Sequence, residues 1–157
     1  MKQYTLAAPV TLQGKGLHTG KNVTLTLKPA EENTGFVFVR VDLEGSPIIE
    51  ADAAYVTSTE RGTVLEKKGV KIQTCEHVLA ALVGMNLDNV SIELDAPEPP
   101  IMDGSAKYFV EAIEKVGIVE QQAERNEYIV REVISYKNEE TGSEITVIPA
   151  DEYQVTT

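Results

Sequence analysis

The chain lacks several features that would assign it to a specialised class of protein. Its 157 residues include no tryptophan and a single cysteine, Cys75. One cysteine cannot form an internal disulfide and favours a reducing compartment, so we expect a cytoplasmic location. No stretch reaches the roughly 18 continuous apolar residues of a membrane span, and residues 1–5 lack the apolar core of a secretion signal. Stable membrane insertion is therefore not expected.

Positive charge is also scarce. Fourteen lysines and arginines stand against 25 aspartates and glutamates, which gives a formal net charge of −11. An acidic surface repels phosphate backbones, so nucleic acid is not an expected partner. The hydrophobic fraction of 42% is high enough for a packed core and too high for intrinsic disorder.

Alternation of apolar and polar residues predicts strands in the first half of the chain. The pattern is strictest at Val23, Leu25 and Leu27, and Pro29 ends it. Residues 36–41 are predicted to form the antiparallel neighbour of this strand. Residues 63–66 and 70–72 flank a glycine-containing turn and predict a short hairpin, and residues 90–94 predict a further strand.

Two segments change to helical spacing. In residues 75–85 the apolar side chains recur every three or four positions, with Thr74 as the predicted N-cap and Gly84 at the predicted end. A second helix is predicted from Ser105 to a stop at Gly117. These elements predict an α+β fold, a two-layer sandwich of a small, mostly antiparallel sheet and two helices.

The last part of the chain has a different character. Residues 121–127 are polar and are predicted to be a linker between a first domain, residues 1–120, and the start of a second, residues 128–157. Residues 128–133 and 144–148 predict a hairpin around Asn138 to Gly142. An isolated hairpin is marginal in water, so we expect it to be the first hairpin of a truncated second domain.

Glu76 and His77 are the residues most suited to chemistry. At a helix start, the positive end of the helix dipole helps to keep a carboxylate ionised. Adjacent helical side chains point about 100° apart, so the pair fits a division of labour, with His77 binding a metal and Glu76 taking a proton from metal-bound water. On the dipeptide alone a purely structural helix start is favoured, because no second ligand stands four residues on.

Other polar residues leave two interpretations open. His18 lies among three glycines, which fits either a ligand-binding loop or a tight turn in which the histidine bonds the local backbone. Glu98 and Asp103 could be site carboxylates, although structural roles are favoured, and Asp103 to Ser105 fits turn and capping chemistry. Cys75 lies on the apolar helix face and is predicted to be a core residue rather than a nucleophile.

Three segments together resemble one enzyme family. They are residues 16–21 (GLHTGK), 74–82 (TCEHVLAAL) and 96–106 (APEPPIMDGSA). Their order and spacing are similar to those of the UDP-3-O-acyl-N-acetylglucosamine deacetylases, zinc enzymes of lipid A biosynthesis in Gram-negative bacteria. The similarity extends over essentially the whole chain and is clearest in residues 2–118.

The resemblance implies roles for individual residues. Glu76 would be the general base and His77 a ligand of a catalytic Zn²⁺. Thr59, Glu60, Arg61, Gly62 and Thr63, together with His18, would line the substrate site. The substrate implied is UDP-3-O-acyl-N-acetylglucosamine, from which the enzyme releases acetate.

The resemblance also implies that the remaining ligands come from a second domain in cis. Because zinc catalysis normally uses three protein ligands and water, we expect the 157-residue chain alone to be inactive. In some bacteria this deacetylase is fused to an acyl-carrier-protein dehydratase. Two alternatives stay open: a non-catalytic α+β binding module, and a one-metal site that uses both His18 and His77.

Overall fold

A five-stranded sheet forms the largest sheet of the first compact unit, residues 1–125. In the computed structural model, which describes residues 1–157, its strands lie in the order β2, β3, β9, β4, β5. The bounds are Val10–Lys15 (β2), Asn22–Pro29 (β3), Phe36–Arg40 (β4), Ile48–Glu50 (β5) and Val90–Leu94 (β9). Val23, Leu25 and Leu27 of β3 are buried, which confirms the predicted alternation.

The predicted neighbour of β3 was wrong. Strand β4 does not pair with β3; it pairs parallel to β9, with Phe36 opposite Val90, and β9 in turn pairs antiparallel to β3. Parallel strands need a long crossover connection, and the chain from β4 to β9 supplies one that includes helix α1. The alternation within a strand predicts which face is buried, but not which strand lies beside it.

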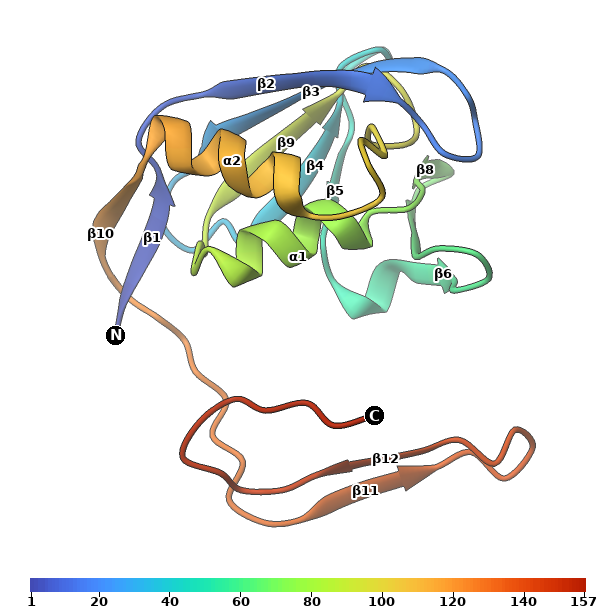
Figure 1. Ribbon diagram of the computed structural model, residues 1–157, viewed down its shortest axis with the longest axis vertical. Coiled ribbons are helices and arrows are strands. Elements are labelled where there is room, and N and C mark those ends of the chain that lie inside the picture. The colour runs from blue at the N-terminus through green and yellow to red at the C-terminus, as the bar shows by residue number, and fades with distance from the viewer. The chain divides into compact units, whose positions relative to one another are not determined.

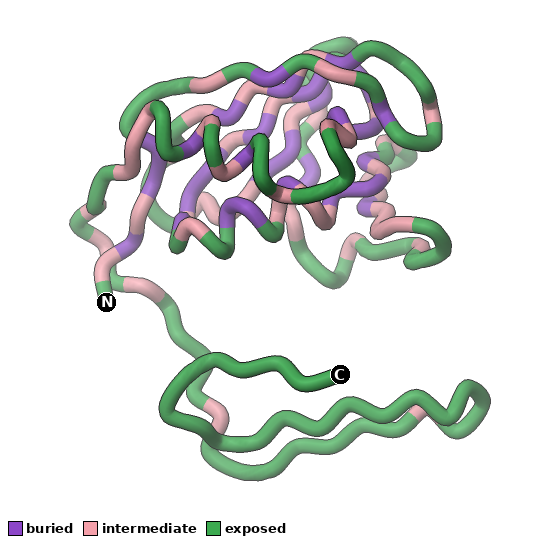
Figure 2. Tube along the Cα trace, in the orientation of Figure 1, coloured by how far each residue is buried: buried purple, intermediate pink, exposed green.

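Both helices cover one face of this sheet (Figure 1). Helix α1 spans Glu76–Gly84 and α2 spans Lys107–Val116, and Gly84 and Gly117 stand at their C-terminal ends as predicted. Buried residues of α1 and α2 and the inward residues of the sheet form one hydrophobic core, seen as the buried layer in Figure 2. Neither helix has the length and apolarity to cross a bilayer.

The predicted N-cap of α1 was also wrong. Thr74 has a left-handed backbone (φ 52°), Cys75 occupies the cap position, and neither side chain bonds the first turn of the helix. The Thr74 hydroxyl instead donates a hydrogen bond to Glu98, 2.9 Å away. A tertiary partner therefore overrides the local capping preference of this threonine.

Two smaller sheets complete the first compact unit, Met1–Arg125. Strands β6 (Val56–Ser58), β7 (Val64–Lys67) and β8 (Val70–Ile72) form one of them, preceded by the 3-10 turn η1 (Ala53–Tyr55), and β7 and β8 confirm the predicted hairpin. Strands β1 (Lys2–Leu6) and β10 (Ile118–Glu124) form the other. Residues 121–124 therefore belong to a strand and not to the predicted linker.

The second unit, Asn126–Thr157, contains one hairpin. Its strands are β11 (Ile134–Lys137) and β12 (Glu144–Val147), so the first strand lies after the predicted residues 128–133. Ile134 pairs with Val147 and Tyr136 with Ile145, which places these four apolar side chains on one face. All four are exposed within the unit.

Together these elements confirm the predicted fold class. The structure is α+β, with two helices layered on a mostly antiparallel sheet. The first turn of α1 and the loops that follow β2, β6 and β8 and precede α2 carry the residues that the sequence singled out.

Candidate functional site

Glu76 is the first residue of α1, one position after the predicted start of the helix but still in its first turn. Its Oε2 accepts a hydrogen bond from the backbone N–H of Thr63, at 3.0 Å, while its Oε1 has no hydrogen-bond donor in the structure. The carboxylate is partly buried at the N-terminal end of α1. One oxygen is thus held by the protein, and the other is available to a ligand or to water.

His77 follows on the same helical turn and is partly exposed. Neither of its ring nitrogens makes a hydrogen bond or an ion pair with another residue. A neutral imidazole with free nitrogens is a suitable zinc ligand. The chain contains no cluster of three or more His, Cys, Asp or Glu residues that could hold a metal ion.

The loop between β6 and β7 lies beside the His18 loop. Nε2 of His18 is 2.9 Å from the carbonyl oxygen of Arg61, and because a carbonyl can only accept, this nitrogen carries the proton. A hollow of about 210 Å³ opens between the two loops. It is lined by His18, Glu60, Arg61, Gly62, Val64, Gln73 and Thr74.

The structure therefore brings together most of the predicted site residues. His18, Glu60, Arg61 and Gly62 share this hollow, and Thr63 reaches Glu76 through its backbone. Thr59 is exposed, and neither it nor Glu76 nor His77 lines the hollow.

Glu98 has a larger part in this region than its sequence context suggested. Its side chain is fully buried and accepts hydrogen bonds from the backbone N–H groups of His18 and Thr19 and from the hydroxyls of Thr19 and Thr74. Burial alone would raise the pKa of the Glu98 carboxyl, but these hydrogen bonds outweigh it and hold the pKa below its usual value. Its contribution to stability is therefore present at neutral pH and is lost as the pH falls through this lowered pKa.

Two further predictions concern residues away from this hollow. Asp103 accepts hydrogen bonds from the N–H and the hydroxyl of Ser105, which confirms its turn chemistry. Cys75 is buried in the core, and burial raises the pKa of its thiol to about 11, so it is a core residue and not a nucleophile.

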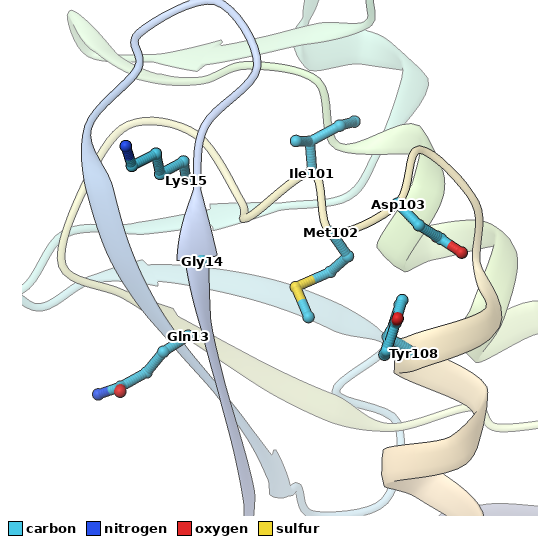
Figure 3. Close-up of a pocket in the computed structure, with 7 residues that line it drawn as sticks. All are labelled: Gln13, Gly14, Lys15, Ile101, Met102, Asp103 and Tyr108. Carbon is cyan, nitrogen blue, oxygen red and sulfur yellow. The ribbon is translucent and has the colours of Figure 1, made fainter.

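A second, larger hollow of about 390 Å³ lies between β2 and the start of α2 (Figure 3). Its lining residues are Gln13, Gly14, Lys15, Ile101, Met102, Asp103 and Tyr108. Of the carboxylates that the sequence offered as candidates only Asp103 lines it, and none of the residues that the family resemblance implies does. This larger hollow is therefore distinct from the region of Glu76 and His77.

Gly16 provides a direct test of how tightly the His18 loop packs. A Cβ at this position would lie 2.5 Å from Oε2 of Glu98 and closer still to the Thr19 hydroxyl. We expect Gly16→Ala to destabilise the protein by about 1–3 kcal/mol, as overpacking does. The matched control is Gly84→Ala at the end of α1, where a Cβ meets nothing within 4 Å and helix propensity favours alanine. Equal denaturation midpoints for the two variants would contradict this packing.

Comparison with known proteins adds the evolutionary context. The family model described as UDP-3-O-acyl N-acetylglycosamine deacetylase matches residues 3–157. A protein of Bacteroides thetaiotaomicron named "Bifunctional enzyme LpxC/FabZ" is 48% identical over 155 residues, 99% of this chain and 34% of that protein. The UDP-3-O-acyl-N-acetylglucosamine deacetylase of Myxococcus xanthus is 44% identical, over 98% of this chain and 48% of its own length. That of Psychrobacter sp. is 50% identical over 78% of this chain and 41% of its own length.

These similarities cover nearly all of the chain but only part of each relative. The chain spans about a third to a half of the length of the curated relatives it matches. The segments around His18, Glu76 and Glu98, which suggested the resemblance, all lie within the matched residues. The chain belongs to the UDP-3-O-acyl-N-acetylglucosamine deacetylase family.

Proposed function

We propose that the complete protein containing this chain is a zinc-dependent deacetylase. It would hydrolyse the N-acetyl group of UDP-3-O-acyl-N-acetylglucosamine in lipid A biosynthesis and release acetate, with this chain as its N-terminal portion. The observation that carries the proposal is the placement of Glu76 and His77 on one helical turn, with the Glu76 carboxylate aimed by the Thr63 N–H. The names of the relatives supply the substrate class.

Glu76 is suited to act as the general base. Its Oε2 is fixed by Thr63, so the unbonded Oε1 can accept a proton from a water molecule without any movement of the backbone. After the attack on the amide carbonyl, the same carboxyl group can pass the proton to the leaving amine.

His77 is suited to be a zinc ligand. Its free imidazole nitrogens and partial exposure fit a ligand that shares its metal with groups outside this chain. When bound, zinc would polarise the amide carbonyl and lower the pKa of the attacking water. Glu60, Arg61 and Gly62 would then lie beside the substrate together with His18, because these four residues share one hollow.

The remaining zinc ligands would come from a second domain in cis. We place the start of that domain in the second unit, whose hairpin presents an apolar face formed by Ile134, Tyr136, Ile145 and Val147. Apolar faces of this kind are normally covered by another layer of the same domain. The length of the relatives leaves room for such a domain.

A one-metal site shared by His18 and His77 is less well supported. The Nε2 of His18 donates to the Arg61 carbonyl, so only its Nδ1 could bind a metal, and the hollow that His18 lines does not include His77. The non-catalytic binding module remains the alternative function. Acetate release by the complete protein would distinguish the deacetylase from this alternative.

The compartment and the wider architecture follow from the same features. We propose a cytoplasmic location, which agrees with a single, buried and unpaired cysteine. We also propose that the complete protein is either a bifunctional fusion, as three relatives of 44–48% identity are named, or a deacetylase alone, as five relatives of 42–50% identity are named. The length of the complete reading frame tests this proposal.

Acetate release from UDP-3-O-acyl-N-acetylglucosamine tests the function. We expect the complete protein to release acetate, to lose activity on chelation and to regain it with Zn²⁺. The 157-residue chain alone should be inactive, since it supplies one of the three ligands that zinc catalysis normally needs. No acetate release by the zinc-loaded complete protein would favour the binding module, and full activity of the short chain would contradict the shared site.

A further inference from the structure

Glu98 is a buried anion without a cationic partner. Its side chain has no exposed surface, and no ion pair of the structure involves it. Such a charge is costly to bury unless hydrogen bonds replace its hydration. Here all of the compensation comes from two segments, the loop at His18 and Thr19 and the turn at Thr74.

The first of these segments leads to the Thr63 amide. Glu98 fixes the backbone of His18 through distances of 3.1 and 3.2 Å to its N–H, and the His18 ring bonds the Arg61 carbonyl at 2.9 Å. Arg61 stands two residues before Thr63, whose N–H bonds the Glu76 carboxylate. The path from Glu98 through the His18 loop therefore ends on Glu76.

The second segment reaches Glu76 by a shorter route. The Thr74 hydroxyl donates to Oε1 of Glu98, and Thr74 stands two residues before Glu76. Thr74 has φ 52°, which is unfavourable for a β-branched residue and therefore needs a tertiary contact to hold it. Gly62 packs against both Thr74 and Glu76. A Cβ added to it would lie 3.3 Å from the Thr74 hydroxyl and 3.4 Å from Oε1 of Glu76.

Glu98 is thus connected to Glu76 in two ways, by hydrogen bonds and the short chain segments between them. One connection runs through the His18 loop and residues 61–63, and the other through Thr74. Together they are the Glu98 circuit. We propose that Glu98 is a positioning residue, which sets the aim of the Glu76 carboxylate by fixing both the His18 loop and the Thr74 turn. Glu98 has no exposed surface with which to touch a substrate, so its action on the reaction passes through these two segments. The effect on catalysis rests on the proposed deacetylase function, whereas the effect on the geometry of Glu76 does not.

Three substitutions in the complete protein test the circuit. Glu98→Gln keeps the shape but removes the charge and one acceptor atom. Thr74→Val keeps the shape but removes the hydroxyl, and Thr74→Ser retains the hydroxyl and should restore the behaviour of the unsubstituted protein. The matched control is Glu93→Gln on β9, which loses only a partly exposed ion pair with Lys28.

We expect Glu98→Gln and Thr74→Val each to lower kcat for acetate release by about tenfold, the equivalent of one charge-assisted hydrogen bond. Hydrogen exchange at the Thr63 amide should accelerate by a similar factor in both variants, although neither substituted residue touches Thr63. Thr74→Ser and Glu93→Gln should change neither quantity. A purely structural role of Glu98 would leave Thr63 exchange in the folded protein unchanged.

The outcomes separate this inference from the proposed function. An unsubstituted complete protein without activity would refute the deacetylase, while exchange at Thr63 would still decide whether Glu98 positions Glu76. Unaltered Thr63 exchange in both variants would overturn the inference, whatever happens to kcat. If Glu98→Gln does not fold, Thr74→Val alone tests the inference, because it removes the hydroxyl that bonds Glu98 while leaving Glu98 itself unchanged.

Discussion

Replacement of Glu76 by glutamine is expected to lower kcat/KM of the complete protein by about 10²–10⁴-fold, the usual contribution of a general base. Glutamine keeps the shape of the side chain, and its carbonyl oxygen can still accept the Thr63 N–H that Glu76 accepts at 3.0 Å. The fold and the affinity for zinc should therefore persist, while the group that takes the proton from water is lost. Steady-state rates of acetate release, measured together with zinc content, provide the test.

Glu66→Gln is the matched control for this substitution. Glu66 lies on β7 and forms an ion pair with Lys71 at 3.2 Å, so the same chemical change there removes only a surface contact. We expect its rate to equal that of the unsubstituted protein. A Glu76→Gln protein that retains full activity would show that another group takes the proton.

Replacement of His77 by alanine is expected to remove most of the bound zinc. Substitutions that disturb only the partners of a zinc ligand reduce affinity by about 10–100-fold, so loss of a ligand itself should exceed about 100-fold. The imidazole of His77 has no hydrogen bond within the chain, so its removal leaves no buried polar group unsatisfied. Competition titration with a chromogenic zinc chelator measures the change.

The zinc affinity of a His18→Ala protein distinguishes a site with His77 as the only ligand from this chain from a site that uses both histidines. If His77 is the only ligand from this chain, the zinc affinity of the His18→Ala protein should remain close to that of the unsubstituted protein. If both histidines bind one metal, the two substitutions should weaken zinc binding to a similar extent. The first result is favoured because His77 does not line the hollow that His18 lines.

Much of the first unit could be predicted because its signals are local. Alternation predicts the buried face of β3, and helical spacing predicts α1 and α2 with their glycine ends. The pairing of β4 with β9 could not be predicted in this way, because it depends on a crossover of about fifty residues and not on either strand. Strand β10 was not predicted for another reason. It forms one side of a two-stranded sheet, where a polar side chain such as Gln121 stays partly exposed and bonds Asn89 and the Ala30 carbonyl in neighbouring loops.

The site was predicted unevenly for the same physical reason. Glu76 was placed at a helix start by local pattern, and the structure adds the Thr63 N–H that aims it. The importance of Glu98 depends on the groups that surround it, which come from residues 24 and 80 positions away in the chain. The local sequence offers one signal only, a charged residue between prolines in an otherwise apolar segment.

The most direct test of the central claim is to locate zinc by anomalous scattering in crystals of the complete protein. The account predicts one zinc ion with a nitrogen of His77 at about 2.0–2.1 Å, and with a water ligand within hydrogen-bond reach of Oε1 of Glu76. His18 should still bond the Arg61 carbonyl in that structure. A zinc ion bound away from His77, or one bound by His18, would contradict the account.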